Sequence, residues 1–194
     1  MSLDKVLQQA RQRRTILTER LQSDLSQYKR CVLEIGCGHG HWLSGYAATH
    51  SDDCCIGIDL STQRIKKTLR KKKNQSLGNL WAYKAEANEF LDCLPPDINC
   101  EYTFIIYPDP WPKQRHHRRR LMQRDFLSRL ARHTAPGGQL YLRTDQQTYI
   151  EWSHQCIKAH QDWRLENTLP WPYEQETFFQ KILPQHISLA AVRM

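Results

Sequence analysis

The chain has 194 residues and a formal net charge of +8 at pH 7, and 40% of its residues are hydrophobic. This length predicts a single domain with its own core, and the lack of any run of about eighteen apolar residues excludes a transmembrane protein. The excess of basic residues favours an anionic partner, and the polar first residues predict a soluble, cytoplasmic protein.

An N-terminal helical arm is predicted for residues 1–29, because Leu and Ile recur at roughly helical spacing in a segment rich in Gln and Arg. The remaining residues, 30–194, are predicted to form one domain. Its first strand is expected at 31–35, where an apolar run leads into a glycine-rich turn. Residues 41–50 follow with helical periodicity.

Further strands and helices alternate along the rest of the chain. Strands are predicted at 54–58, 80–83, 103–106 and 139–143, with extended stretches near 163–169 and 187–193. Helices are predicted after Ser61, which is a suitable N-cap, at 87–94, from Leu121 to the residues before Pro136, and at 149–160. This alternation predicts an α/β fold with a parallel sheet covered by helices on both faces.

The seven cysteines include the adjacent pair Cys54-Cys55 and no C-x-x-C motif. Adjacent strand residues point to opposite faces, so the pair predicts buried free thiols in a reducing compartment rather than a disulfide framework. His39 and His41 have no second pair of soft ligands at zinc-like spacing, and we therefore expect no metal site.

Acidic residues follow four of the predicted strands at their carboxyl ends. They are Glu34 with its glycine turn, Asp59, Glu86 and Asp109. Ligands of open α/β sheets bind beyond these ends, where the strand order reverses. We therefore expect the four side chains to line one ligand site.

The glycines after the first strand, Gly36, Gly38 and Gly40, discriminate between cofactors. Their G-x-G-x-G spacing differs from the G-x-G-x-x-G fingerprint of dinucleotide-binding proteins, and Glu34 would repel a pyrophosphate. The same carboxylate tolerates the sulfonium and amino group of S-adenosylmethionine, and Asp59 follows at a distance typical of a ribose-binding acid. The pattern favours S-adenosylmethionine over a nicotinamide cofactor, with a tight turn of purely structural value as the alternative.

The most distinctive stretch is YPDPWPKQRHHRRR, residues 107–120. Prolines fix the backbone on both sides of Asp109, so this acid stands on a stiff turn and is followed by Trp111. Four arginines come next and are expected to contact the phosphates of a nucleic acid: Arg115, Arg118, Arg119 and Arg120. The alternative is a proline-rich turn leading into a solvated basic helix, and the lysine-rich helix after Ser61 permits the same two interpretations.

Together with the motifs at 32–36, 57–59, 136–138 and 142–145, this stretch resembles the bacterial tRNA (guanine-N7)-methyltransferases over roughly residues 31–183. The resemblance implies a Rossmann-like class I methyltransferase fold, in which a mostly parallel seven-stranded sheet has an antiparallel C-terminal strand. It also implies S-adenosylmethionine as cofactor, tRNA as partner, and formation of N7-methylguanosine in the variable loop.

The resemblance also implies roles for individual residues. Glu34, Asp59 and Glu86 match cofactor-binding positions, and Asp109 matches the acid at the centre of the active site. Matches to substrate-binding positions are Lys113, Asp145 and the late motif with Thr177, Phe179 and Gln180. Guanine N7 has a free lone pair and needs no general base, so Asp109 is expected to anchor the base and to act as a counter-charge. Trp111 or Phe179 is able to stack on that base.

Gln180 departs from the resemblance, because the family has a glutamate at this position. A neutral amide oxygen accepts a weaker hydrogen bond than a carboxylate does, unless Glu174 or Glu176 compensates. This departure leaves two alternatives open: a methyltransferase with another RNA or a small-molecule acceptor, and an inactive RNA-binding homologue. A monomer and a homodimer are both compatible with the sequence.

Overall fold

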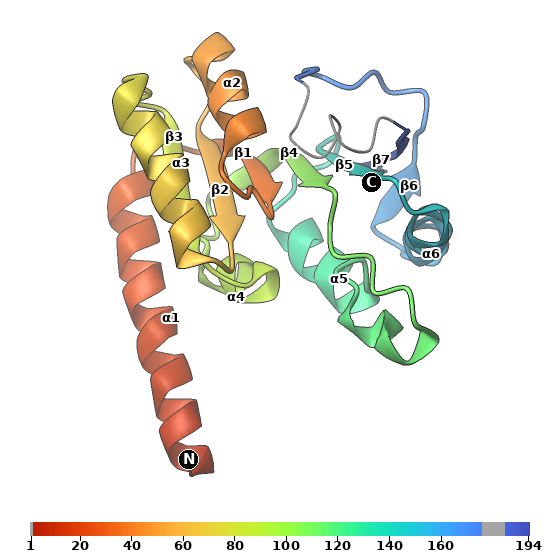
Figure 1. Cartoon of the computed structure of the whole chain (residues 1–194), viewed down its shortest axis with the longest axis horizontal. Helices are drawn as coiled ribbons and strands as arrows, with labels where there is room; N and C mark the ends of the chain where they lie inside the picture. Colours follow the sequence, from red (N-terminus) through yellow and green to blue (C-terminus); the bar gives the residue numbers. More distant parts are fainter. Residues whose placement is uncertain (1, 176–184) are drawn as a thin grey trace.

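The fold is a single seven-stranded sheet between two layers of helices (Figure 1), in a computed structural model that describes residues 2–175 and 185–194. The strand order is β3-β2-β1-β4-β5-β7-β6, and β7 alone runs antiparallel to its neighbours. The strands are β1 (Arg30–Ile35), β2 (Cys55–Asp59), β3 (Leu80–Lys84), β4 (Asn99–Ile106), β5 (Gln139–Thr144), β6 (Trp163–Leu165) and β7 (Ile187–Arg193). The predicted α/β fold with an antiparallel C-terminal strand is confirmed.

Helices cover both faces of the sheet, with α2 and α3 on one side and α4, α5 and α6 on the other (Figure 1). The described helices are α1 (Leu3–Leu25), α2 (His41–Thr49), α3 (Thr62–Asn74), α4 (Ala87–Cys93), the 3-10 helix η1 (Gln114–Arg119), α5 (Arg124–Arg132) and α6 (Gln147–Lys158). None of them is long and apolar enough to cross a membrane.

Two elements start three or more residues away from their predicted positions. Strand β4 begins at Asn99, four residues before the predicted start, because its first half contains polar and partly exposed residues that hydrophobicity does not detect. Helix α5 begins at Arg124 rather than at Leu121. The basic run before it forms the short helix η1, which ends at Arg119 and leaves an extended Arg120 between the two helices.

Helix α1 packs through its C-terminal half only. Leu17, Leu21 and Leu25 are buried in the main core, whereas Leu3 and Leu7 near the N-terminus are exposed. These buried residues recur every four positions, which places them on one face of the helix. The arm predicted from the sequence therefore contributes its last turns to the core.

The cysteines follow the prediction made from Cys54-Cys55. Cys54 packs in the hydrophobic cluster on one face of the sheet and Cys55 in the cluster on the other. All seven cysteines are free thiols, and six of them are buried.

Candidate active site

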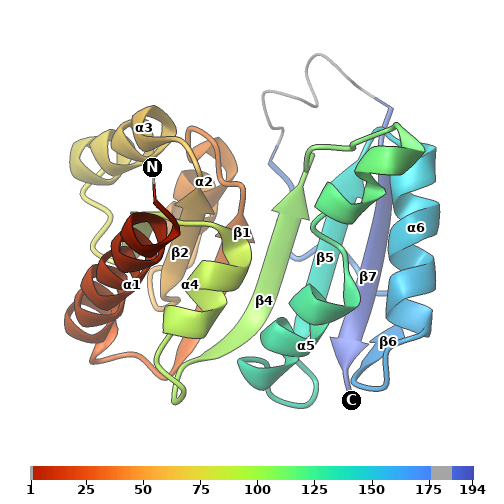
Figure 2. The same ribbon diagram turned by 90° about the horizontal axis from the view of Figure 1, so that it is seen from below.

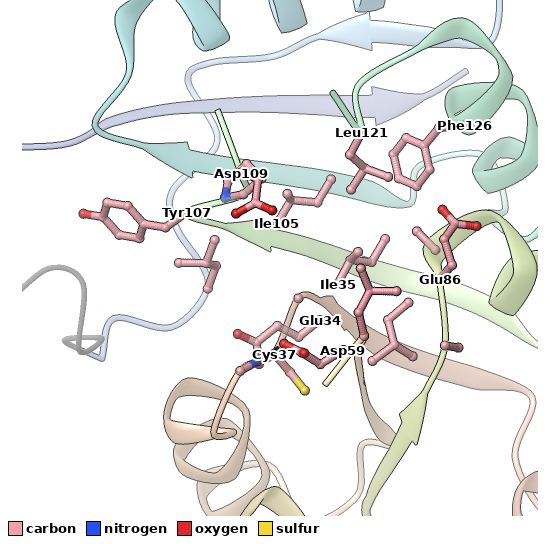
Figure 3. Close-up of a pocket in the computed structure, with 18 of the residues that line it drawn as sticks. Glu34, Ile35, Cys37, Asp59, Glu86, Ile105, Tyr107, Asp109, Leu121 and Phe126 are labelled. Carbon is pink, nitrogen blue, oxygen red and sulfur yellow. Dashed lines mark hydrogen bonds between the residues drawn. The ribbon is translucent and has the colours of Figure 1, made fainter. Parts of the chain in front are cut away.

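A cavity of about 900 Å³ opens at the carboxyl ends of β1, β2 and β4 (Figure 3). The order of the strands reverses between β1 and β4, so this is the place where an open α/β sheet binds its ligand. Six of the seven predicted cofactor-binding residues line the cavity: Glu34, Gly36, Gly38, Asp59, Glu86 and Asp109. The structure therefore brings together all four acids that end the predicted strands.

The glycine turn after β1 has three residues in the left-handed region of backbone conformation. Gly36, Gly38 and Gly40 have φ angles of 78°, 56° and 66°, a region that side chains disfavour. Gly40 does not line the cavity. A Cβ at this position would lie 2.5 Å from Cγ2 of Thr68, so Gly40 allows α3 to pack closely against the turn.

The carboxylate of Asp59 organises the turn and the start of α3. It accepts hydrogen bonds from the backbone N–H of Gly38 at 3.1 Å and of Ser61 at 2.7 Å, and Nη1 of Arg64 lies 3.5 Å away. Asp59 is buried, and a carboxylate offers about four acceptor positions. One position thus remains for a donor in the cavity.

Glu34 is a buried acid without a charge partner among the described residues. Its Oε2 has no hydrogen-bond partner there, and the side chain faces the cavity close to Asp59 (Figure 3). Burial raises the pKa of Glu34 to about 8; the negative charge of Asp59 adds to this, and a hydrogen bond from the backbone of Leu43 opposes it. A cation in the cavity would favour the ionised form.

Two polar side chains that follow β3, those of Glu86 and Asn88, line the cavity. Glu86 is the N-cap of α4, and its Oε2 accepts from the N–H of Glu89 at 3.0 Å. Asn88 also lines the cavity, and its buried Oδ1 has no partner among the described residues. Asn88 is not among the residues predicted from the sequence, although its position two residues after Glu86, at a predicted strand end, is a signal for a place in the site.

Asp109 stands across the cavity from Glu34 and Asp59 (Figure 3). The turn that holds it is bounded by two non-glycine residues with positive φ, Tyr107 at 51° and Trp111 at 42°. Such conformations cost energy and persist where the surroundings enforce them, often at functional sites. The predicted stiff turn is therefore also a strained one.

Arg120 supports this turn from within the protein. Only 2% of the residue is exposed, Nε donates to the carbonyl of Pro110 at 3.1 Å, and Nη1 donates to the carbonyl of Thr148 at 3.3 Å. The expectation that Arg120 contacts phosphates is wrong, because its guanidinium is buried and hydrogen-bonded to the backbone.

The other basic residues of this stretch remain accessible. Arg118 and Arg119 line the cavity, and the Arg119 guanidinium lies 4.8 Å from the centre of the Trp111 ring. Lys113 and Arg115 are exposed and do not line the cavity. Their predicted role in substrate binding requires a surface outside the cavity.

Of the remaining predicted substrate residues, the structure describes Asp145, which does not line the cavity. Asp145 is half-buried after β5 and accepts a hydrogen bond from Nε2 of Gln146 at 2.6 Å. Thr177, Phe179 and Gln180 lie outside the described residues, as does Glu176.

The segment just before those residues is anchored to the sheet. Glu174 accepts two hydrogen bonds from the guanidinium of Arg143, and the indole Nε1 of Trp42 donates to the carbonyl of Tyr173 at 3.3 Å. Glu174 is thus engaged with Arg143. Compensation for Gln180 by Glu174 or Glu176 stays a prediction, because Glu176 and Gln180 lie outside the described residues.

Comparisons with known proteins agree with this geometry. Residues 28–181 match a family described as "Putative methyltransferase". A tRNA (guanine-N(7)-)-methyltransferase of Alkalilimnicola ehrlichii is 39% identical over 137 residues, which are 71% of this chain and 57% of that protein. Its counterpart in Roseobacter denitrificans is 33% identical over 84% of this chain and 75% of its own length. The chain spans 53% to 60% of three of these curated relatives.

Solved structures share the fold at low sequence identity. The aminoglycoside resistance methyltransferase NpmB1 superposes with a TM-score of 0.63 at 18% identity, covering 91% of this chain and 93% of that one. TrmN from Thermus thermophilus has a TM-score of 0.61 at 15% identity, covering 92% of this chain and 48% of that one. These similarities show the class I methyltransferase architecture.

Proposed function

This chain belongs to the putative methyltransferase family, and from this membership we propose that it transfers a methyl group from S-adenosylmethionine to N7 of a guanine in tRNA. Relatives that are 33% to 39% identical have the name tRNA (guanine-N(7)-)-methyltransferase. The observation that carries the proposal is the buried side chain of Glu34, whose Oε2 has no hydrogen-bond partner among the described residues and which faces Asp109 across one cavity.

The cofactor side of the cavity fits S-adenosylmethionine. Glu34 and Asn88 present buried acceptor oxygens without partners among the described residues, and Asp59 has one further acceptor position. These groups suit a ligand with a positive charge and several N–H and O–H donors. When bound, the cofactor supplies an electrophilic methyl group on a sulfonium.

On the acceptor side, Asp109 orients the guanine. The N7 lone pair attacks the methyl carbon directly, the carbon–sulfur bond breaks, and its electron pair stays on sulfur. No proton has to leave before the attack, so Asp109 acts as a hydrogen-bond acceptor and counter-charge. Rate then depends on orientation, and displacement by about 1 Å costs on the order of a hundredfold. The strained turn and the Arg120 bonds hold Asp109 in place.

The acceptor is a nucleotide in the tRNA variable loop, extruded from its stack so that N7 reaches the cavity. Lys113 and Arg115 bind phosphates outside the cavity, where contacts give affinity without sequence specificity. Asp145, Thr177, Phe179 and Gln180 bind the substrate in this proposal.

Two other functions compete with this one because of Gln180. They are methylation of another RNA or a small molecule, and RNA binding without catalysis. Incubation with S-adenosylmethionine and bulk tRNA that lacks the modification, followed by chain cleavage specific for N7-methylguanosine, separates the three. Cleavage in the variable loop supports the proposal. Methyl transfer elsewhere favours the first alternative, and no transfer with retained RNA binding favours the second.

Asp109→Asn tests the active-site assignment in the same assay. Turnover should fall by on the order of a hundredfold or more, because the anchor loses its charge, while tRNA binding changes little. Asp52→Asn is the matched control. Asp52 is exposed in the loop before β2, at the amino ends of the parallel strands and thus away from the cavity at their carboxyl ends. Equal loss of turnover and tRNA binding in Asp109→Asn would contradict the assigned role.

A further inference from the structure

Helix α3 has an unusual charge content. Its thirteen residues include no acid and seven cations: Arg64, Lys66, Lys67, Arg70, Lys71, Lys72 and Lys73. Several of these cations are three or four positions apart, a spacing at which like charges repel and destabilise a helix. Solvated helices usually intersperse acids at that spacing, so solvation alone does not account for the composition of α3.

The pairing of these cations also differs from that on other helices. Arg13 of α1 pairs with Glu89, and Arg129 of α5 pairs with Asp125. Among the described residues, Arg64 is the one cation of α3 with a carboxylate partner.

Lys66 and Arg70 lie on the exposed side of α3, one turn apart. Both are exposed, and neither has an ion-pair partner within the described ranges. Lys72 points elsewhere, with its ammonium 3.7 Å from the centre of the Trp81 ring. The exposed side of α3 thus presents uncompensated positive charge to solvent.

This surface continues to the mouth of the cavity. Nζ of Lys67 lies 3.5 Å from Nε2 of His39, and Nζ of Lys71 lies 2.8 Å from Nδ1 of His41. Both histidines line the cavity. The positive surface therefore begins at the cofactor side of the opening and extends outward along α3.

A second basic surface borders the cavity from the other side. Arg118 and Arg119 of η1 line it there, and Figure 2 shows α3 and η1, the short green helix above α5, on opposite sides of the carboxyl ends of the strands. A ligand that reaches into the cavity and is longer than its mouth meets both surfaces.

We propose that the exposed side of α3 is a second phosphate-binding surface, which holds the RNA backbone on the cofactor side of the cavity. This inference rests on the proposed tRNA substrate and extends it. The tRNA then spans the opening, with one backbone segment on η1 and another on α3. The exposed charges follow one another along the helix axis. The segment from Lys66 to Lys73 is about 10 Å long at a rise of about 1.5 Å per residue, and such a row of charges suits the phosphates of an extended polymer.

The test compares two variants that each lose two positive charges. Lys66→Gln/Arg70→Gln removes charge from α3, and Arg132→Gln/Lys158→Gln removes one Arg and one Lys from the far ends of α5 and α6. All four residues are exposed. Fluorescence anisotropy with an unmodified tRNA transcript, over about 50 to 200 mM salt, measures affinity and its salt dependence. Calorimetry with S-adenosylmethionine checks the cofactor site in both variants.

The α3 variant should bind tRNA about tenfold more weakly at low salt, and its slope of log K against log salt should become shallower by one to about two. KM for tRNA rises while kcat at saturation stays within about twofold. The control variant should change affinity less than about threefold. Cofactor binding and thermal stability should match the parent protein in both variants.

If the α3 variant kept the affinity and salt slope of the control, the inference would be overturned. Methylation of tRNA by the parent protein would in that case leave the proposed function standing. A parent protein that binds no tRNA at all would refute both.

Discussion

Arg143 and Glu174 form a two-point ion pair that joins the end of β5 to a segment 31 residues later. Nη1 lies 2.9 Å from Oε2 and Nη2 lies 2.8 Å from Oε1. The Arg143 side chain is buried, its guanidinium lies 3.9 Å from the centre of the Trp171 ring, and Nε donates to the hydroxyl of Ser188. One arginine thus fixes the C-terminal segment against both β5 and β7.

Glu174→Gln tests what this pair contributes. Arg143 keeps its burial and loses its counter-charge, and because Glu174 is 61% exposed we expect a loss of about 1 kcal/mol rather than the larger cost of a fully buried pair. This corresponds to a decrease in Tm of about 2 to 4 °C for a chain of this size. Thermal unfolding at pH 7 measures it, with Glu151→Gln as the matched control, because Glu151 is an exposed residue of α6.

The same pair has a predictable pH dependence. Arg143 lowers the pKa of Glu174 from its ordinary value. A lowered pKa in the folded state means that the stabilisation is present above the ordinary glutamate pKa and is lost as the pH falls through the folded value. The Tm difference between the parent protein and Glu174→Gln should therefore shrink on acidification below about pH 4. A difference that is constant with pH would refute the electrostatic explanation.

Because the pKa of Glu34 is raised, we expect cofactor binding to release a proton from this side chain. Its pKa of about 8 leaves the free protein mostly protonated at pH 7, and a cationic ligand favours the ionised form. Calorimetry with S-adenosylmethionine at pH 7, in buffers of different ionisation enthalpy, should show release of close to one proton. Affinity should increase with pH up to about 8 and then level off. Glu34→Gln should bind more weakly and release none.

Stability of the ligand-free protein should show the opposite dependence on pH. Because the folded-state pKa of Glu34 is raised, the folded protein binds more protons than the unfolded chain between the ordinary value of 4.5 and about 8. Stability should therefore fall as the pH rises through this window, and this component should be missing in Glu34→Gln. Urea unfolding at several pH values measures it; identical profiles for the two proteins would exclude a buried, protonated Glu34.

Gly40→Ala and Gly38→Ala should both lower stability, because each glycine has a positive φ that a side chain disfavours. Gly40→Ala should lower it more, and Gly38→Ala should also affect the cofactor site. The added methyl at Gly40 meets Thr68 at 2.5 Å, so we expect a loss of more than about 1 kcal/mol. At Gly38 the nearest atom is 4.0 Å away, and the methyl enters the cavity lining instead. Chemical denaturation and cofactor calorimetry on both variants separate the effects. Combining Gly40→Ala with Thr68→Ala should cost less than the sum of the two changes.

The position of the cavity could be predicted from the sequence, because each residue that marks it stands at or just after the end of a predicted strand. Glu34, Asp59, Glu86 and Asp109 each follow a short apolar run, and parallel strands bring their carboxyl ends to one edge. The Arg143–Glu174 pair is different, because nothing in either neighbourhood indicates a partner 31 residues away. Such contacts depend on the tertiary position of a segment and leave no periodic pattern in the chain.

The run of arginines after Trp111 shows the same limit. Its members look equivalent in sequence, yet Arg115 is exposed and Arg120 is buried against two backbone carbonyls. Which arginine turns inward depends on where η1 ends and on Thr148, 28 residues further along. The pattern of charges in the sequence predicts that this surface binds anions. It does not identify which arginine of the run is buried and supports the fold.

Arg115→Gln and Arg120→Gln should therefore fail in different ways. Arg115→Gln should lower tRNA affinity severalfold and reduce the slope of log K against log salt by about 1, with Tm unchanged, because an exposed phosphate contact is lost. Arg120→Gln should lower Tm by several degrees, because the carbonyls of Pro110 and Thr148 lose buried hydrogen bonds of about 1 to 3 kcal/mol.

The consequence for catalysis separates the two arginines further. Loss of the Arg120 bond to Pro110 frees the turn that holds Asp109, so kcat at saturating tRNA should fall on the order of tenfold while the salt slope stays at the parent value. Arg120→Lys restores the charge without the two-directional geometry of the guanidinium and should recover little of the rate. Full recovery by lysine, or a shallower salt slope in Arg120→Gln, would mean that this side chain leaves its buried position to bind RNA.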